Sequence, residues 1–251
     1  MNRIPIVEIF NSIQGEGPNV GARCIFVRVK GCSYACKWCD SKFTWGSDSY
    51  PATEYTPEEL IVHLSKVTHD TSCRRIVLTG GNPCLYDFSE VINQLNHSPR
   101  EYEQNITFDV ETQGDILPEW LKTVDTVVFS PKAPSSGMKD TFSNIVSYIK
   151  NDAGPNQHVA IKVPVFNDED IEFARKYAEF VNWHTMNCDD DLRMYLSVGN
   201  SDVEETGQIR NRVLADYESL ITRIDNNPTN FENVFILPQL HTLVWGNKQG
   251  V

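Results

Sequence analysis

The sequence has few cysteines, no long apolar run and a deficit of positive charge. Seven cysteines in 251 residues are too sparse for a secreted disulfide scaffold. No apolar stretch approaches the roughly 20 residues of a membrane-spanning helix, and the N-terminus lacks the apolar region of a signal peptide. The 22 basic against 34 acidic side chains give a formal charge of −12, which disfavours a general nucleic-acid surface. These absences predict a cytoplasmic protein that binds a small molecule and neither nucleic acid nor a membrane.

Strand-like and helix-like segments alternate along the whole chain. Helical patterns begin after cap residues at Thr56, Asp87 and Asn167, each followed by acidic side chains. The alternation predicts βαβ units and a parallel sheet, either doubly wound or curled into a full or partial barrel. No repeat or linker divides the chain, so we expect one domain over residues 1–251. The predicted strands are the apolar runs Cys24–Val29, Ile76–Thr79, Ile106–Val110, Val127–Ser130, Val159–Val165, Met194–Val198 and Val234–Leu237.

Unusual polar sequences follow most of these predicted strands. The carboxyl ends of parallel strands meet at one mouth of a barrel or one edge of a sheet, where active sites are built. We therefore expect a site there that combines the cysteines after the first strand with Gly80-Gly81-Asn82-Pro83, Glu111-Thr112-Gln113-Gly114, Ser130-Pro131-Lys132, Gly199-Asn200 and Pro238-Gln239-Leu240-His241.

Three cysteines, Cys32, Cys36 and Cys39, lie in a loop over residues 31–45 with the spacing C-x3-C-x2-C. Three thiolates leave one iron of a [4Fe–4S] cubane without a protein ligand. In radical S-adenosylmethionine (SAM) chemistry that iron binds the amine and carboxylate of SAM, and an electron from the cluster releases a 5′-deoxyadenosyl radical. The alternative is a structural zinc site that borrows His241 or Cys73, although zinc usually takes two short ligand pairs. The spacing favours the cluster and SAM.

The turn Gly80-Gly81-Asn82-Pro83 follows an apolar strand, so its glycines allow the backbone to approach a ligand closely. Beside the cysteine loop it is a candidate pocket for the amino-acid part of SAM; alone it would be an ordinary strand-to-helix turn. Radical SAM proteins commonly carry glutamate at the position of Asn82, whose amide oxygen is a neutral acceptor.

Arg28 alternates with Val27 and Val29 along the first predicted strand, so it points away from the helix-covered face and into the barrel. A guanidinium in that place needs a carboxylate, which the substrate could bring. The other interpretation is an internal ion pair with Glu8 or Glu111. Similarly, Ser41 is either a Mg²⁺ ligand or a turn former, and His241 is either a substrate contact or a structural residue.

From residue 5 to its end, the sequence closely resembles the 7-carboxy-7-deazaguanine synthases, a radical SAM family. Apart from the cysteines, no single motif is specific for this family, but the order of the motifs and their coverage of the whole chain are. These are the opening Glu8-Ile9-Phe10-Asn11-Ser12-Ile13-Gln14-Gly15-Glu16-Gly17, then Phe26-Val27-Arg28, Trp38-Cys39-Asp40-Ser41, Gly80-Gly81-Asn82-Pro83, Glu111-Thr112-Gln113-Gly114, Ser130-Pro131-Lys132 and Pro238-Gln239-Leu240-His241.

The resemblance implies a modified partial (β/α) TIM-like barrel, a homodimer, and conversion of 6-carboxy-5,6,7,8-tetrahydropterin to 7-carboxy-7-deazaguanine with loss of ammonia, on the route to queuosine. SAM would be regenerated, and a reductant such as flavodoxin or ferredoxin would supply the electron. It implies Ser41 as the Mg²⁺ ligand and no fixed role for the C-terminal tail, residues 238–251. The implied substrate contacts are Gln14, Gly15, Glu16, Arg28, Thr79, Glu111 and His241, and the implied SAM contacts are Trp38, Cys39, Asp40, Gly81, Ser130, Pro131, Lys132, Gly199 and Asn200.

Two other functions share parts of this pattern. A radical SAM activase that makes a glycyl radical on a partner protein has the same cysteine spacing, but it needs an exposed docking surface for that partner. A non-catalytic zinc or iron–sulfur module in electron transfer would not cleave SAM. Cleavage of SAM by the reduced, reconstituted protein separates the enzyme from such a module.

We predict that anaerobic reconstitution yields about four irons per chain, because three thiolates and one open iron make up a cubane site. Replacing Cys32, Cys36 or Cys39 with Ala should abolish turnover, whereas Cys73→Ala and Cys188→Ala should leave it intact. Metal analysis and turnover assays measure both outcomes. Stoichiometric zinc without iron in anaerobically purified, active protein would contradict the assignment.

Overall fold

One curved sheet of nine strands organises the computed structural model, which describes residues 3–96, 106–188, 192–200, 202 and 207–251. The strand order is β3-β1-β2-β4-β5-β6-β7-β8-β9. From β2 to β9 every neighbouring pair is parallel, as the alternation of strands and helices predicts. The sheet does not close on itself, which is compatible with a partial barrel.

All seven predicted strands are present, and two further strands were not predicted. Strand β1 (Ile4–Ile13) pairs antiparallel with β2, and β3 (Thr53–Tyr55) pairs antiparallel with β1. Polar residues at Glu8, Asn11 and Ser12 interrupt the apolar pattern of β1, and β3 has only three residues. The predicted strands correspond to β2 (Arg23–Val29), β4 (Arg75–Gly80), β5 (Thr107–Thr112), β6 (Thr126–Phe129), β7 (His158–Val165), β8 (Arg193–Val198) and β9 (Val234–Leu237).

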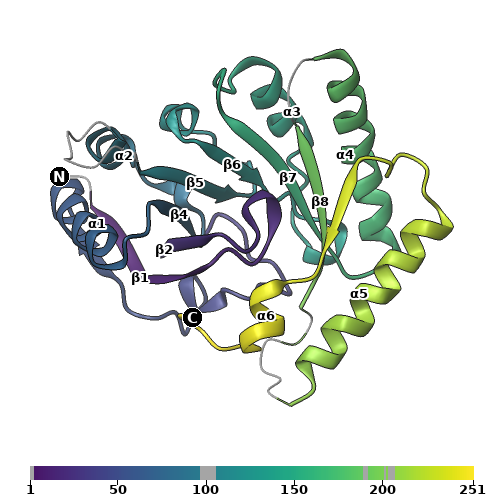
Figure 1. The fold of residues 1–251 in the computed structure, drawn as a ribbon, viewed down its shortest axis with the longest axis horizontal. Coiled ribbons are helices and arrows are strands. Elements are labelled where there is room, and N and C mark those ends of the chain that lie inside the picture. Colours follow the sequence, from purple (N-terminus) through teal and green to yellow (C-terminus); the bar gives the residue numbers. More distant parts are fainter. Residues whose placement is uncertain (1–2, 97–105, 189–191, 201, 203–206) are drawn as a thin grey trace.

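Helices α1 to α5 lie around the outside of the curved sheet (Figure 1). Thr56 caps α1 with a reciprocal capping box to Glu59, and the Asn167 side chain accepts a hydrogen bond from the Asp170 amide at the start of α4. The Asp87 carboxylate accepts from the Ser89 amide before α2, so all three predicted helix starts are confirmed. The helices are α1 (Pro57–Thr71), α2 (Ser89–Asn96), α3 (Phe142–Asn151), α4 (Asp168–Asn187) and α5 (Ile209–Asn226). None of the helices described is both long and apolar enough to cross a bilayer.

The two faces of β2 have different surroundings, as its sequence predicts. Ile25, Val27 and Val29 are completely buried in the core beneath the helices. Arg28 faces the opposite side and lines a cavity on the concave face of the sheet. The alternation of β2 therefore aims one charged side chain into the interior of the partial barrel.

The turn between β1 and β2 folds across the concave face of the sheet (Figure 1). It contains the short helix η1 (Gly17–Asn19), which contacts β7 and β8. The Asn19 side chain donates to Asp109 Oδ2 at 2.8 Å, and Arg75 Nη1 lies 2.7 Å from Asp109 Oδ1. Because Asp109 is 2% exposed, these partners compensate its lost hydration. The same turn carries Glu16 toward the sheet interior.

The last segment of the chain runs from β9 back toward β1. After β9, the short helix α6 (Leu240–Trp245) begins with the Leu240 amide donating to the Gly15 carbonyl at 3.0 Å. Arg210 on α5 donates to the carbonyls of Leu243 and Val244, which fixes the other side of α6. Helix α6 and the tail lie at the mouth of the open sheet (Figure 1).

Candidate active site

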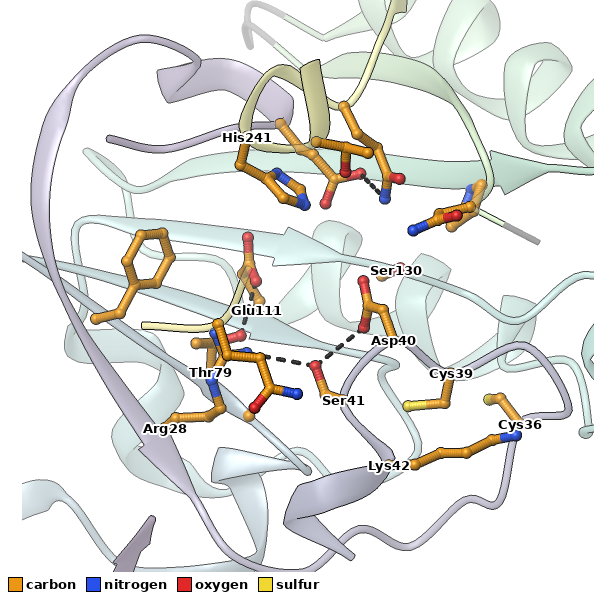
Figure 2. Close-up of a pocket in the computed structure, with 18 of the residues that line it drawn as sticks. Arg28, Cys36, Cys39, Asp40, Ser41, Lys42, Thr79, Glu111, Ser130 and His241 are labelled. Atoms are coloured by element: carbon orange, nitrogen blue, oxygen red, sulfur yellow. Dashed lines mark hydrogen bonds between the residues drawn. The ribbon is translucent and has the colours of Figure 1, made fainter. Parts of the chain in front are cut away.

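A cavity of about 430 Å³ lies at the carboxyl ends of the parallel strands, and Figure 2 shows part of its lining. The cavity brings together residues from both ends of the chain and from the loops after β2, β4, β6 and β8. Of the site residues predicted from sequence, Gly15 and Pro131 are absent from its wall. Those that line it are Gln14, Glu16, Arg28, Cys32, Cys36, Trp38, Cys39, Asp40, Ser41, Thr79, Gly81, Glu111, Ser130, Lys132, Gly199, Asn200 and His241.

The three cysteines of the loop all face this cavity, and N–H groups point at two of their sulfurs. The indole Nε1 of Trp45 donates to Cys39 Sγ at 3.3 Å, and the Tyr34 amide donates to Cys32 Sγ at 3.4 Å. Hydrogen bonds of this kind stabilise the charge on thiolates that bind iron. The loop therefore offers a soft donor set that fits a [4Fe–4S] cluster.

Burial raises the pKa of all three loop thiols, which favours their protonated form as long as no metal is bound. Burial raises the pKa of Cys36 to about 11, although the nearby ammonium of Lys132 opposes that rise. A bound metal deprotonates such a thiol, because its positive charge stabilises the thiolate. Among the described residues, no three His, Cys, Asp or Glu side chains converge on one ion. A cubane does not require such convergence, since each thiolate binds a different iron.

The turn after β4 packs directly against the cysteine loop. A Cβ on Gly81 would lie 1.6 Å from the Gly31 carbonyl oxygen, so only glycine permits this approach. The backbone N–H of Asn82 donates to the same carbonyl at 2.8 Å. The backbone of Gly80-Gly81-Asn82-Pro83 is thus fixed beside the cysteines.

The Asn82 side chain is completely buried and is not part of the cavity wall. Its Nδ2 donates to Asp115 Oδ1 at 3.1 Å and to Ser33 Oγ at 3.2 Å. Its Oδ1 accepts from the Cys84 amide and from Thr112 Oγ1. Asn82 therefore ties the turn after β4 to the cysteine loop and to the segment after β5.

An aromatic wall and a lysine lie beyond the cysteines. The rings of Trp38 and Phe166 are 4.7 Å apart, and a Cβ on Gly199 would meet the Phe166 ring at 2.0 Å. Lys132 Nζ donates to Ser130 Oγ at 3.0 Å and lies 5.9 Å from the Trp38 ring. A flat apolar surface beside a cation is suited to an aromatic ligand that carries a carboxylate.

Arg28 forms an internal ion pair with Glu8, one of the two partners that the sequence left possible. Its Nε donates to Glu8 Oε1 at 2.7 Å, and its Nη1 donates to Ser41 Oγ at 3.3 Å. The guanidinium also lies over the rings of Phe10 and Phe43, each 5.4 Å from the ring centroid. Figure 2 shows Arg28, Ser41 and Asp40 linked in a row, with His241 across the cavity. Arg28 is therefore fixed through its Nε and its Nη1 in the wall of the cavity.

His241 at the start of α6 lies against the turn between β1 and β2. A Cβ on Gly15 would stand only 2.2 Å from His241 Nδ1. Gly15 thus leaves room for the imidazole, although Gly15 itself does not line the cavity. This contact explains why a glycine outside the wall still shapes the site.

Lys162 is the most buried cation of the cavity wall and was not predicted from the sequence. Its Nζ lies 2.7 Å from Glu16 Oε2 and 3.8 Å from Glu111 Oε1. The signal was a single lysine inside the apolar run of β7, in which the neighbouring residues are core. A lysine at such a position requires a buried anion, and the sequence alone does not identify that anion.

The cysteine loop, the glycine turn and the parallel sheet are those of a radical SAM protein. A family model described as the Radical SAM superfamily matches residues 26–178, and the chain belongs to this superfamily. The chain is 38% identical to the 7-carboxy-7-deazaguanine synthase of Bacillus subtilis, over 99% of this chain and 98% of that protein. The Bacillus cereus synthase is 36% identical over the full length of both proteins. Within the superfamily, the chain therefore belongs to the 7-carboxy-7-deazaguanine synthase family.

The solved structures agree with this assignment at the level of the fold. A crystal structure of QueE from Escherichia coli matches with a TM-score of 0.63 at 22% identity, covering 95% of each chain. The predicted radical SAM fold and the family resemblance are confirmed. The glycyl-radical activase and the non-catalytic metal module are not favoured by relatives that match along the whole chain.

We predict that Asn82→Asp destabilises the protein strongly. The substitution replaces two N–H donors with an oxygen that faces the Asp115 carboxylate, in a completely buried place. An unpaired buried group of this kind costs about 3 kcal/mol of unfolding free energy, measured by urea denaturation.

The matched control is Asn211→Asp on the exposed side of α5, which should change the unfolding free energy by about 0.5 kcal/mol at most. Because a buried carboxyl resists ionisation, the loss at Asn82 should also lessen as the pH falls. Equal, small losses in both variants would show that Asn82 is not a structural link.

Proposed function

We propose that this chain is a 7-carboxy-7-deazaguanine synthase that converts 6-carboxy-5,6,7,8-tetrahydropterin to 7-carboxy-7-deazaguanine with loss of ammonia, a step toward queuosine and other 7-deazapurines. The observation that supports this most is one cavity in which three loop cysteines face a wall rich in paired charges. The full-length relatives that carry this name support the same substrate.

Membership of the superfamily implies a [4Fe–4S] cluster and SAM as cofactors. Bound together, they would supply a carbon radical that removes a hydrogen atom from the substrate, and a hydrogen atom would be returned to the product radical at the end. In our proposal Cys32, Cys36 and Cys39 hold the cluster, and the Gly81 backbone and Lys132 bind the amino-acid part of SAM. The remaining proposed SAM contacts are Trp38, Asp40, Ser130, Pro131, Gly199 and Asn200.

The substrate-binding residues are proposed from the other walls of the cavity. Glu16 and Glu111 accept hydrogen bonds from ring N–H groups, and Gln14 and Thr79 orient Glu111 through hydrogen bonds of 3.1 and 2.8 Å. Gly15 leaves the space that the His241 imidazole occupies, and from there His241 would contact the ligand. These side chains fix one orientation of the pterin, which decides the hydrogen that faces the radical.

Arg28 is the proposed anchor of the substrate carboxylate. Glu8 accepts from Nε of the guanidinium and Ser41 Oγ accepts from Nη1, so the group is oriented in the cavity wall while both terminal nitrogens keep N–H groups for a further acceptor. A guanidinium end of this kind matches a carboxylate in a bidentate manner. Glu8 would then position Arg28 and would not compete with the substrate for the same nitrogens.

Mg²⁺ is proposed to bridge Ser41 and the substrate carboxylate. A hard dication prefers oxygen ligands and often keeps several waters while it joins protein to substrate. Ser41 Oγ lies 2.9 Å from Asp40 Oδ1 and faces the cavity beside Arg28. The hydroxyl is thus in a place where oxygen ligands of protein and substrate would meet.

Three further features complete the proposal. A flavodoxin or ferredoxin would reduce the cluster, because radical SAM chemistry requires an electron donor. The protein would be a homodimer and would act in the cytoplasm. Its formal charge of −12 agrees with a small-molecule substrate.

Anaerobic incubation with SAM, reductant, Mg²⁺ and 6-carboxytetrahydropterin tests the proposed function. We expect mass spectrometry to detect 7-carboxy-7-deazaguanine, with SAM not consumed in proportion to product. Omitting Mg²⁺ should slow wild-type turnover but should hardly affect Ser41→Ala. SAM cleavage without any deazaguanine would refute the substrate, and an equal Mg²⁺ response in both proteins would remove Ser41 from the metal site.

We predict that Arg28→Ala weakens binding of 6-carboxytetrahydropterin by about 10- to 200-fold, because a hydrogen bond to a charged group contributes about 1.5–3 kcal/mol. Arg28→Lys should restore only part of the affinity, since a point charge cannot replace a bidentate fork. SAM affinity, measured by calorimetry, should hardly change in either variant.

The result that would contradict this role is normal pterin binding by Arg28→Ala together with a much lower unfolding temperature. Arg28 would then serve only the ion pair with Glu8. A second readout is the ratio of free 5′-deoxyadenosine to product, which should increase when the substrate is misplaced.

A further inference from the structure

Lys162 is a buried cation of the cavity wall for which the proposed function provides no role. It lies in the middle of β7 and is 8% exposed, while Glu16 is 13% and Glu111 is 19% exposed. Its Nζ makes a 2.7 Å contact with Glu16 and a 3.8 Å contact with Glu111. One ammonium thus stands between two carboxylates that come from the β1–β2 turn and from β5.

Side-chain amide and hydroxyl groups donate hydrogen bonds to both carboxylates. Gln239 Nε2 donates to Glu16 Oε1 at 3.2 Å, on the side away from Lys162. Gln14 Nε2 and Thr79 Oγ1 donate to the two oxygens of Glu111. A carboxylate has about four acceptor sites, so each oxygen keeps capacity for a further donor. Glu16 and Glu111 therefore present oriented acceptors to the cavity.

The charges of Lys162, Glu16 and Glu111 depend on one another. Burial alone would raise the pKa of Glu16, but Lys162 and, after it, His241 lower that pKa to about 2. Burial would likewise lower the pKa of Lys162, whereas Glu111 and then Glu16 raise it above its ordinary value. Glu16 therefore stays ionised until the pH falls through about 2. Without Lys162, burial favours a protonated Glu16, whose carboxyl is a poorer acceptor.

A tetrahydropterin is rich in N–H donors, since its amino group, one nitrogen of the pyrimidine ring and both nitrogens of the reduced ring carry hydrogen. Two fixed carboxylates are suited to such a ligand. We propose that Lys162 is a positioning residue that holds Glu16 and Glu111 together as paired, ionised acceptors for the N–H groups of the reduced pterin. This inference rests on the proposed function and extends it to a residue that acts through its two neighbours.

The experiment measures anaerobic binding of 6-carboxytetrahydropterin to reconstituted enzyme by calorimetry at pH 8 and pH 6. Wild type, Lys162→Met and Lys162→Arg are compared, because methionine keeps the length of the side chain and arginine keeps its charge. Lys162→Met should bind about 10- to 200-fold more weakly than wild type at pH 6 and lose less at pH 8. Lys162→Arg should restore much of the affinity and the flat pH profile. Ionisation of the ligand itself affects all variants equally, so it cancels in the comparison.

Two controls isolate the effect of Lys162. Lys122→Met removes a lysine that pairs with Glu119 and Asp152 outside the cavity, and it should leave binding unchanged. His241 also acts on Glu16, so the comparison is repeated with His241→Gln in every protein. The other charged residues that line the cavity stay constant in all variants: Arg28, Asp40, Lys42, Lys132 and Lys248.

The outcomes separate this inference from the proposed function. If wild type converts the pterin and Lys162→Met binds it with wild-type affinity at both pH values, the role of Lys162 is refuted and the function stands. A pH-independent loss in both Lys162 variants, together with a lower unfolding temperature, would make Lys162 a structural brace and would also refute the inference. Failure of the wild type to bind or convert the pterin would overturn both proposals.

Discussion

The contact between the turn after β4 and the cysteine loop fixes the geometry on which the rest of the site depends. The Gly31 carbonyl accepts a hydrogen bond from the backbone N–H of Asn82. The two segments are so close at Gly81 that no side chain fits there. Asn82 then extends the link to Ser33 in the loop and to Asp115 after β5. Loops from three neighbouring strands are thereby locked together, and the three thiols are held in the position from which they face the cavity.

Two ion pairs with different surroundings contribute to the wall of the cavity. The pair of Arg28 and Glu8 is partly exposed, at 18% and 25%, and one nitrogen of the guanidinium satisfies it. The pair of Lys162 and Glu16 is more deeply buried, so neither group can rely on water to keep its charge. The first arrangement fixes a donor in the cavity wall, whereas the second fixes an acceptor there. A polar ligand with both a carboxylate and several N–H groups would find a partner in each ion pair.

The sequence was sufficient to predict elements whose signals are local. The seven parallel strands, the capped starts of α1 and α4, and the inward direction of Arg28 follow from alternation and cap chemistry. Strand β1 was missed because the polar residues Glu8, Asn11 and Ser12 break its apolar pattern.

The remaining features depend on partners that are far away along the chain. Lys162 and Glu16 are separated by 146 positions, and Gln239 and Glu16 by 223, so no spacing rule connects them. The buried role of Asn82 likewise depends on Ser33 and Asp115, which only the fold brings together. Local chemistry thus predicted the cysteine loop, whereas the pairing of charges required the structure.

The contact of α6 with the β1–β2 turn has a consequence for how the protein is made. The wall of the cavity combines Gln14 and Glu16 from the start of the chain with Gln239 and His241 from its last elements. During synthesis the cysteine loop therefore emerges long before the segments that enclose it. Contacts of such long sequence separation form late, because a large loop must close first. The cavity wall around the three thiols is accordingly complete only once α6 has packed against the β1–β2 turn.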